Sequence, residues 1–366
     1  MGKAKSTMEG MERLGMSEDN ILDFYNGKRV LITGDTGFKG SWLSKIMVMS
    51  GAKVYGFSNG YTEDPSLNKL IQLESKMTHI EGDVRNLDEV KKVFDVAKPE
   101  IVFHLAAQAI VRKSYVDPVY TYETNVIGTV NVLECIRLSD TVKSFVNVTS
   151  DKVYLNDERK EGFKEDDMLN GIDPYSNSKS CSELVTSSYK KSFFNDKKIG
   201  ISTVRAGNVL GGGDYAKDRI IPDCVRAVKS GKSILVRNPN SVRPYQHVLD
   251  ALGAYMLVAK MQYEDVGFSG EYNVGPNVNN IVMTNKVVEM FCSKWGKGAS
   301  WECMNENGPY ESNFLSLNCE KFKKTFNWSP KWDIDKTIDK VVEFEKCSTE
   351  EYEKCMEKQI MEFFVL

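Results

Sequence analysis

Three adjacent side chains that can move protons follow one apolar run of the sequence. In VTSDKVY, residues 148–154, a hydroxyl (Ser150), a carboxyl (Asp151) and an amine (Lys152) stand side by side. A hydroxyl can bind a substrate hydroxyl, a carboxyl whose pKa is raised by burial can donate a proton, and a neutral lysine can accept one. This trio suits a reaction that transfers more than one proton. The alternative for Lys152 is a charged residue that merely ends a strand at the surface.

A tyrosine and a lysine lie four residues apart in PYSNSK, at Tyr175 and Lys179. Residues at this spacing share one face of a helix, so both side chains are expected to point the same way. A lysine ammonium lowers the pKa of a nearby phenol, which can then take a proton from a sugar hydroxyl while hydride leaves for a cofactor. The pattern is common in proteins, and its position after Ser150 gives it weight here.

A glycine-rich turn, TGDTGFKG, follows the β-branched run RVLIT and precedes a helical pattern. Glycines there allow a tight turn and a close approach of the backbone to a pyrophosphate, which the helix N-terminus attracts. Both the preceding strand and the following helix are recognisable, as this motif requires. The turn therefore predicts a dinucleotide site that includes Gly34, Thr36, Gly37, Phe38, Lys39 and Gly40.

The choice of dinucleotide is less directly encoded. The second strand ends in Gly56, Phe57, Ser58 and Asn59, without the acid that usually holds the ribose hydroxyls of NAD and without an arginine. Asp83, after the third strand, is expected to meet the adenine. Lys39 could favour the 2′-phosphate of NADP, although a solvent-facing lysine is the preferred interpretation. We predict NAD.

Short apolar runs alternate with helical patterns from residue 28 to about residue 206. Strands that are apolar on both faces and separated by helices predict a Rossmann-type, doubly wound parallel sheet. Beyond Asn208 the composition predicts a smaller C-terminal α/β substrate-binding lobe. The expected division is an N-terminal tail (1–25), a mainly NAD-binding domain (26–207) and a lobe with interleaved segments (208–366). A charged amphipathic helix is expected over the last 30 residues or so.

Composition excludes several functions. The 366 residues carry 48 Lys plus Arg and 51 Asp plus Glu, a formal net charge of -3, which argues against nucleic-acid or membrane-surface binding. No apolar run approaches the ~20 residues of a membrane span, and the start lacks a secretory signal. Eight scattered cysteines without a CxxC pair and three histidines argue against disulfides and against a metal site. We expect a cytoplasmic protein.

From about residue 28 to about residue 260, the sequence resembles the extended short-chain dehydrogenase/reductase family, and within it the nucleotide-sugar 4,6-dehydratases. The resemblance rests on GDTGFKGSWL, HLAAQAIVRKSYVDP, TNVIGTVNVLE, VTSDKVY, PYSNSKSCSELV, VRAGNVLGGGDYAKDRIIPD and VRPYQHVLD. The phrases SDK, GGGDYAKDR and RPYQHV are most similar to the CDP-sugar branch, so CDP-glucose is the favoured substrate.

The resemblance implies a reaction in which tightly bound NAD oxidises C4 of the sugar, water is eliminated across C5 and C6, and hydride returns to C6. It implies that Ser150 and Tyr175 bind the C4 hydroxyl, that Lys179 assists the tyrosine and that Asp151 protonates the leaving C6 hydroxyl. Lys152 occupies the place where many relatives carry a glutamate base. A neutral Lys152 could be the base, and a charged Lys152 could instead stabilise the enolate oxygen.

The resemblance also implies ligand contacts from other segments. His104 and Asn125 are expected either near the pocket or in structural roles, and Arg219 either at phosphate or in a surface pair with Asp218 or Asp223. The further cofactor contacts implied are Val84, Leu105, Ala106, Ala107, Gln108 and Thr124, and the substrate contacts are Arg112, Ser114, Asn208, Asp214, Arg219, Arg243 and His247. The helices that start near Thr121 and Tyr175 are expected to pair in a homodimer or a dimer of dimers.

Three alternatives remain at this point. The substrate could be another nucleotide sugar, including a heptose, or the protein could be a nucleotide-sugar C4-epimerase or reductase. A cofactor-binding sensor or scaffold that has lost catalysis is the third. Epimerisation by transient oxidation has no need of an acid and a base at C6 and C5, so Asp151 and Lys152 favour dehydration, and the presence of Tyr175 and Lys179 argues against a lost activity.

Overall fold

The protein is described by a computed structural model over residues 20–61, 64–194, 196–304 and 312–365. Most of the predicted N-terminal tail therefore lies outside the described residues. Its last part contains a short helix, α2 (Ile21–Tyr25). Within the described ranges no helix is both long and apolar enough to cross a membrane.

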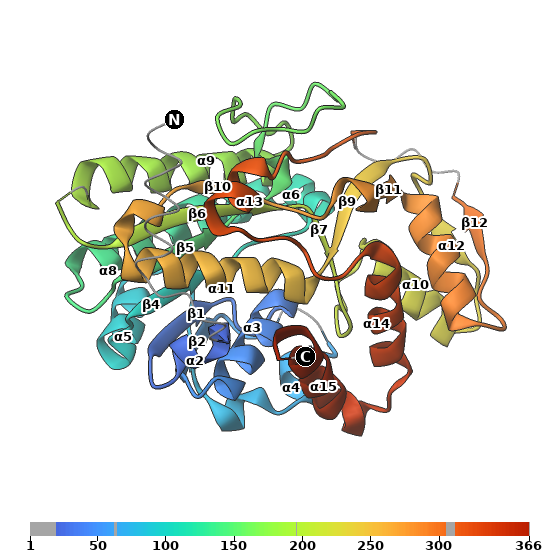
Figure 1. Ribbon diagram of the computed structural model, residues 1–366, viewed down its shortest axis with the longest axis horizontal. Coiled ribbons are helices and arrows are strands. Elements are labelled where there is room, and N and C mark those ends of the chain that lie inside the picture. Colours follow the sequence, from blue (N-terminus) through green and yellow to red (C-terminus); the bar gives the residue numbers. More distant parts are fainter. Residues whose placement is uncertain (1–19, 62–63, 195, 305–311, 366) are drawn as a thin grey trace.

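A sheet of seven parallel strands forms the centre of the molecule (Figure 1). Every neighbouring pair in it is parallel. The predicted doubly wound parallel sheet is thus confirmed. In spatial order the strands are β10 (Glu271–Val274), β6 (Gly200–Ala206), β5 (Ser144–Val148), β4 (Ile101–His104), β1 (Arg29–Thr33), β2 (Lys53–Ser58) and β3 (Thr78–Glu81).

Helices cover both faces of this sheet, because alternate residues of each strand point to opposite sides. In β1, Val30 and Ile32 belong to the core on one face, and Leu31 belongs to the core on the other. The first face is covered by α3 (Phe38–Met49) and α11 (Val248–Glu264), and the second by α5 (Leu87–Ala97), α8 (Gly128–Leu138) and α9 (Pro174–Tyr189). Apolar strands buried on both sides are the physical reason for the continuous apolar runs of the sequence.

The smaller lobe lies at one end of the large sheet, to the right in Figure 1. The chain returns from it to the large sheet with α11 and β10, so the two parts are interleaved. The lobe contains a three-stranded sheet of β7 (Asn208–Leu210), β9 (Val242–His247) and β11 (Ile281–Met283), and a pair of β8 (Ile234–Val236) and β12 (Trp301–Cys303). Its helices are α10 (Ile220–Lys229), α12 (Thr284–Trp295) and α14 (Ile334–Lys346).

Short helices complete the chain. They are α4 (Leu67–Leu70), α6 (Val111–Val116), α7 (Pro118–Tyr122) and α13 (Glu320–Phe326). A π-type turn, Glu123–Ile127, joins α7 to α8, so the long helix expected from Thr121 is continuous but locally widened.

The expectation of one C-terminal amphipathic helix is wrong. Two helices, α14 and α15 (Tyr352–Phe364), are separated by a short 3-10 turn that begins after Ser348. Ser348 and Glu351 form a capping box, in which each side chain satisfies the backbone N–H of the other. The pattern S-x-x-E starts a helix, so the sequence STEE carried the signal for this break.

Candidate active site

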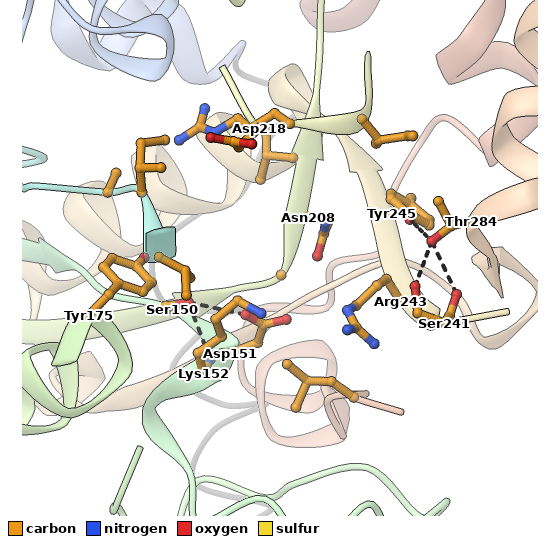
Figure 2. A pocket seen from close by; sticks show the side chains of 18 of the residues that line it. Ser150, Asp151, Lys152, Tyr175, Asn208, Asp218, Ser241, Arg243, Tyr245 and Thr284 are labelled. Atoms are coloured by element: carbon orange, nitrogen blue, oxygen red, sulfur yellow. Dashed lines mark hydrogen bonds between the residues drawn. The ribbon is translucent and has the colours of Figure 1, made fainter. Parts of the chain in front are cut away.

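A cavity of about 500 Å³ lies between the carboxyl ends of β5 and β6 and the smaller lobe (Figure 2). Ligand sites of open α/β sheets form at this edge of the strands. The cavity walls come from the turn after β5, the start of α9, the segment after β6 and the strands of the lobe. Its size suits a small organic ligand.

The SDK turn, residues 150–152, places the side chains of Ser150 and Asp151 next to each other on the cavity wall. Ser150 caps the 3-10 turn that follows it. The Lys152 amide donates to Ser150 Oγ (3.2 Å), and Ser150 Oγ donates to Asp151 Oδ1 (3.1 Å). This short turn is why three consecutive residues can face one space, and Lys152, half-buried, also lines the cavity.

Asp151 has the properties of an acid. Its side chain is buried, and its Oδ2 has no hydrogen-bond partner among the described residues. Burial raises the pKa of the Asp151 carboxyl, and this outweighs the opposing effects of Lys152, Ser150 and Arg243. The direction agrees with the raised pKa that the sequence argument required. A protonated carboxyl with an unused oxygen in a cavity can donate to a ligand.

Tyr175 and Lys179 share the buried face of α9, as their spacing predicts. The Asp173 side chain caps this helix by accepting from the Ser176 amide (3.0 Å), and Pro174 occupies its first turn, which places Tyr175 at the cavity. Helix start and reactive residue are therefore specified by the same short sequence.

Burial outweighs the neighbouring groups at both Tyr175 and Lys179. Burial raises the pKa of Tyr175 to about 12, although a hydrogen bond with Ser150 opposes it. Lys179 Nζ instead donates to the carbonyl of Val148 (3.2 Å), and burial lowers the pKa of Lys179 to about 8. Desolvation exceeds the attraction between neighbours here because both groups lie in the interior.

The glycine turn after β1 forms a cradle that any larger residue would fill. Gly34 has a φ of 75°, and a Cβ on it would lie 2.7 Å from the Ala106 nitrogen. A Cβ on Gly40 would lie 2.0 Å from the Gly34 oxygen. Gly37 begins α3 without a side-chain cap, so the first amides of the helix point at the cradle unsatisfied. These features fit the pyrophosphate of a dinucleotide.

The neighbouring polar groups agree with a cofactor groove along this edge. The Thr36 hydroxyl bonds to Ser58 Oγ (3.0 Å) and the Gly60 carbonyl (2.7 Å), and so ties the turn to the end of β2. The buried Thr124 hydroxyl oxygen has no partner within the described ranges. Leu105, Ala106 and Ala107 follow β4 directly and stay partly exposed.

Lys39 does not face solvent as expected. It lines the cavity, with Nζ 5.8 Å from the centre of the Tyr255 ring. Burial, together with the cations Arg219 and Lys179, lowers the pKa of Lys39 to about 7. These neighbours belong to the sugar side of the cavity, so Lys39 is poorly placed to reach a 2′-phosphate on the adenosine ribose.

Asp83 lies at the end of β3 beside the end of β2, where Rossmann folds hold the adenosine. Its carboxylate accepts from Arg85 (2.8 Å) and from Asn59 Nδ2 (3.4 Å). Val84 is buried and packs against Gly128. The Asp83 carboxylate is thus held in place by protein groups.

His104, Gln108 and Asn125 are internal hydrogen-bonding residues. The ring nitrogens of His104 contact the hydroxyls of Thr33 (2.7 Å) and Thr129 (3.2 Å), and burial lowers its pKa to about 3. Asn125 accepts from the Gln108 amide (2.8 Å) and donates to the Gln108 carbonyl (3.0 Å). The structural alternative holds for His104 and Asn125.

Arginines surround the far half of the cavity. Arg219 donates to Asp214 Oδ2 (2.9 Å), and both line the cavity together with Asn208 and Arg112. Arg243, also in the wall, is buried and donates to the carbonyls of Val242 (2.9 Å) and Asn313 (3.3 Å).

Two residues expected at the substrate do not line this cavity. His247 is buried, and its Nδ1 accepts from the Leu249 amide (3.2 Å) at the start of α11, with its ring packed between Trp42 and Trp332. Burial lowers the pKa of His247 to about 3. Ser114 is also buried and donates to the Val111 carbonyl (2.6 Å).

Sequence analysis missed part of the cavity wall in the lobe. Tyr245 and Ser241 each contact the Thr284 hydroxyl, at 2.9 and 2.8 Å (Figure 2). Arg237, in the loop RNPNS, donates to Asp218 (2.6 Å). The loop composition with its single arginine was a usable signal for Arg237. The remaining positions come together only through the pairing of β7, β9 and β11.

A doubly wound parallel sheet with a glycine cradle after β1 and a serine, tyrosine and lysine at β5 and α9 defines an extended short-chain dehydrogenase/reductase. Residues 31–341 match the model of the family described as GDP-mannose 4,6 dehydratase. The chain therefore belongs to this family of nucleotide-sugar dehydratases. The match continues well past residue 260, where the resemblance in the sequence ended.

Individual relatives agree with the family. The chain is 43% identical to the CDP-glucose 4,6-dehydratase of Salmonella typhimurium over 330 residues, which cover 88% of this chain and 92% of that protein. The crystal structure of dTDP-glucose 4,6-dehydratase from Bacillus anthracis with NAD is similar at 26% identity and a TM-score of 0.73. The similarity covers 89% of this chain and 99% of that chain. A Thermus thermophilus UDP-glucose 4-epimerase complex with NAD shares the fold at 24% identity and a TM-score of 0.76. The similarity covers 87% of this chain and 99% of that chain.

Proposed function

We propose that this protein is a CDP-glucose 4,6-dehydratase, which converts CDP-glucose to CDP-4-keto-6-deoxyglucose. The observation that carries the proposal is the buried Asp151 carboxyl beside Lys152, in the same cavity as Ser150 and Tyr175. Elimination of water needs an acid and a base beyond the tyrosine, whereas epimerisation does not. The similarity to the Salmonella enzyme over nearly the whole chain supports the same reaction and the same nucleotide.

The cofactor that we propose is NAD, held by the glycine cradle at Gly34, Gly37 and Gly40. When bound, it accepts hydride from C4 of the sugar and returns hydride to C6. Ser58 and Asn59 at the end of β2 offer hydroxyl and amide groups to the adenosine ribose and no cation for a 2′-phosphate. Lys39 reaches the cavity from the cradle and would supply positive charge beside the diphosphate groups.

Ser150 and Tyr175 would act on the C4 hydroxyl. Ser150 would bind this hydroxyl and Tyr175 would accept its proton. Burial raises the pKa of Tyr175 to about 12, so formation of its phenolate needs a nearby cation. Lys179, one turn along the same face, is a cation that would stabilise the phenolate.

Asp151 and Lys152 would act at C6 and C5. The protonated Asp151 would donate to the C6 hydroxyl as it leaves as water, which its raised pKa supports. Lys152 would remove the C5 proton as a neutral amine, or it would stay charged and stabilise the enolate oxygen. Both roles need its position on the cavity wall, and the experiment below on Lys152 distinguishes them.

The nucleotide would lie toward the lobe. Arginine suits diphosphate oxygens because its planar fork donates two parallel hydrogen bonds. Of the candidates, Arg112, Arg219 and Arg237 line the cavity with guanidinium groups paired to Asp214 or Asp218. Arg243 is held by carbonyls of residues 312–313 and would present its remaining donors.

The test is proton NMR of the purified protein with CDP-glucose in heavy water, with GDP-, UDP- and dTDP-glucose in parallel. A new C6 methyl signal with deuterium at C5, from CDP-glucose alone, is the expected result. A methyl signal from one of the other three nucleotide sugars would mean that the enzyme accepts that nucleotide. Absence of a methyl signal from all four would refute glucose dehydration and direct the search to epimerised products and to heptoses.

A homodimer is also proposed, built from the adjacent helices α8 and α9. Their outer faces carry apolar side chains that are 57% exposed at Leu138 and 56% exposed at Leu184, and Ile127 in the π-type turn is 47% exposed. Apolar groups on neighbouring surface helices favour association with a second copy. A four-helix interface of this kind would leave the cavity open.

A further inference from the structure

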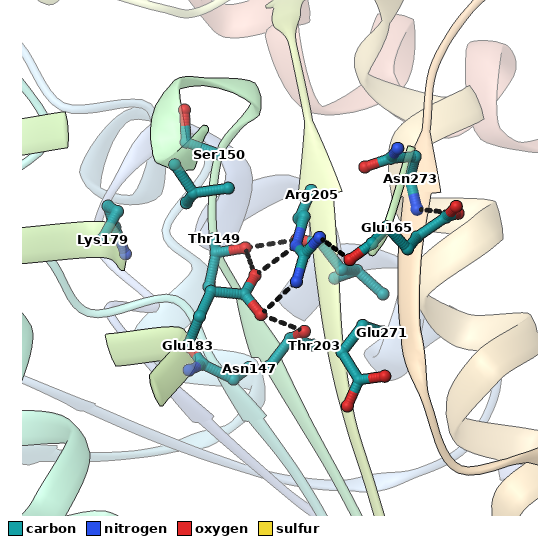
Figure 3. A network of polar contacts seen from close by, with 12 residues as sticks. Asn147, Thr149, Ser150, Glu165, Lys179, Glu183, Thr203, Arg205, Glu271 and Asn273 are labelled. Atoms are coloured by element: carbon teal, nitrogen blue, oxygen red, sulfur yellow. Dashed lines mark hydrogen bonds and ion pairs between the residues drawn. The ribbon is translucent and has the colours of Figure 1, made fainter. Parts of the chain in front are cut away.

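A buried carboxylate on α9 has all of its acceptor positions filled by protein groups (Figure 3). Glu183 is 2% exposed. One oxygen accepts from the Thr149 hydroxyl (2.5 Å) and Arg205 Nε (2.9 Å). The other accepts from the Thr203 hydroxyl (2.6 Å) and the second Arg205 nitrogen (3.0 Å). Four donors on one buried carboxyl group fix its position.

The partner arginine is equally enclosed. Arg205, in β6, is 2% exposed. Its remaining nitrogen donates to the Tyr154 hydroxyl (2.7 Å) and to the Glu165 carbonyl (2.9 Å). Tyr154 in turn donates to Asn273 Oδ1 (2.7 Å). The network therefore runs from α9 across β6 to β10, and Glu183, Arg205, Tyr154 and Asn273 in it are all buried.

This network adjoins the reactive groups from two sides. Thr149 directly precedes Ser150, so the hydrogen bond from Thr149 to Glu183 ties the SDK turn to α9. Glu183 lies four residues after Lys179, and the two side chains share the buried face of the helix. Ser150 is thus the chain neighbour of a residue that is hydrogen-bonded to Glu183, and Lys179 lies one helical turn before Glu183.

We propose that Glu183, held by Arg205, is a positioning residue that fixes Ser150 and Lys179 relative to one another and supplies the negative charge that Lys179 faces. The proposal rests on the roles given to Ser150 and Lys179 in the proposed function. A buried ion pair adds little stability over a well-packed apolar pair, so its presence beside these two groups points to a task in the site.

The surroundings of Lys179 make Glu183 its important charged neighbour. On its own helix Lys179 faces Tyr175 and Glu183, from β4 it faces His104, and from α3 it faces Lys39. His104 is uncharged at neutral pH because burial lowers its pKa to about 3, and any charge on Lys39, whose pKa is lowered to about 7, has the same sign as that of Lys179. Among the described residues, Glu183 is the one group whose charge raises the pKa of Lys179, against the larger effect of burial.

The experiment measures the titration of Lys179 itself. The full-length protein is labelled with [ε-¹³C]lysine, the Lys179 signal is assigned by its loss in Lys179→Arg, and its midpoint is followed by NMR against pH without added substrate. Glu183→Gln keeps the shape and the two hydrogen bonds to its remaining oxygen, loses the acceptor of the other two, and removes the charge. We expect the Lys179 midpoint to fall by about 1 pH unit in this variant. The alkaline limb of kcat should move by the same amount.

Two further variants keep the test decisive. Glu183→Gln combined with Arg205→Met leaves no unpaired buried charge, so it should fold even if the single variant does not, and it should also lower the midpoint. Thr186→Val is the matched control, because Thr186 lies on the same helix as Glu183. This substitution removes a buried hydroxyl contact to Asn147 (2.9 Å) without changing any charge. Its midpoint should equal that of the wild type.

The proposal is overturned if Lys179 titrates as in the wild type when Glu183 is neutral, or if Thr186→Val causes an equal shift. The second result would mean that Glu183 only packs α9. Because the titration needs no turnover, this failure is distinct from a failure of the proposed function, which the wild-type reaction with CDP-glucose tests separately.

Discussion

Replacing Asp151 by asparagine tests whether Asp151 supplies the proton that the proposed elimination needs. Asparagine has nearly the same shape, and its carbonyl oxygen can keep the contact from Ser150, which donates to Asp151 Oδ1 at 3.1 Å. The other oxygen, Oδ2, has no partner within the described ranges, so the new amide breaks no protein hydrogen bond. The substitution therefore removes the acid and little else.

The expected effect is a selective loss of elimination. General acid catalysis contributes about 10²–10⁴-fold, so kcat for methyl formation should fall by about this factor in Asp151→Asn. Oxidation at C4 relies on Ser150, Tyr175 and Lys179 and should continue, so the reduced cofactor and the 4-keto sugar should accumulate. Rapid-mixing absorbance follows the reduced cofactor, and NMR follows the methyl group in the same samples.

Stability provides the control for this variant. Because burial raises the pKa of Asp151, the folded state holds a proton that the unfolded chain releases near pH 4. Ionisation of Asp151 therefore costs folding stability as the pH rises from about 4 through the folded pKa. Asp151→Asn escapes this cost, so its stability relative to the wild type should increase over that range in thermal unfolding.

Two results would refute the argument. Full dehydration by Asp151→Asn would mean that another group protonates the leaving hydroxyl. An equal loss of C4 oxidation and elimination in a stably folded variant would mean that Asp151 binds or orients the sugar and is not a specific acid.

Four other substitutions test the remaining assignments. Lys152→Ala should slow exchange of the C5 proton into heavy water by about 10²-fold or more if the lysine is the base, and a normal exchange rate in NMR would exclude that role. Lys39→Met should weaken retention of NAD by about tenfold, measured as cofactor released after dialysis, and unchanged retention would remove Lys39 from the cofactor site. The pKa of His79 is raised by its hydrogen bond to Asp35 (2.8 Å), so the pair stabilises the fold fully below about pH 6.5 and loses this contribution as the pH rises through the folded pKa. His79→Gln should therefore cost about 1 kcal/mol in denaturant unfolding at pH 6 and less at pH 8, and a cost that is independent of pH would contradict this. Leu184→Glu should shift the protein to monomers in analytical ultracentrifugation, and an unchanged dimer would place the interface elsewhere.

The sequence alone predicted the large sheet and the reactive residues because their signals are local. RVLIT, the glycines after it and the helix-start residues of DPYSNSK each specify an element within a few residues of chain. In the structure these become β1, the cradle and α9. The order of such segments was also enough to indicate the family, which the match over residues 31–341 establishes.

Interactions between distant segments could not be predicted in this way. Arg219 pairs with Asp214, and Lys39 turns into the cavity beside Tyr255. Both outcomes depend on how the lobe and α11 close over the edge of the sheet. The pKa of Tyr175 rises for a related reason, because burial by the whole fold exceeds the effect of any one neighbour.

The sequence by itself thus determined which groups could do chemistry and on which elements they lie. Only the tertiary structure decided their state: Asp151 became a buried acid, His247 a helix cap, and Glu183 a carboxylate saturated by Arg205 and two threonines. The physical reason is that periodicity and helix caps are encoded over a few adjacent residues, whereas desolvation and charge pairing are set by residues that only folding brings together.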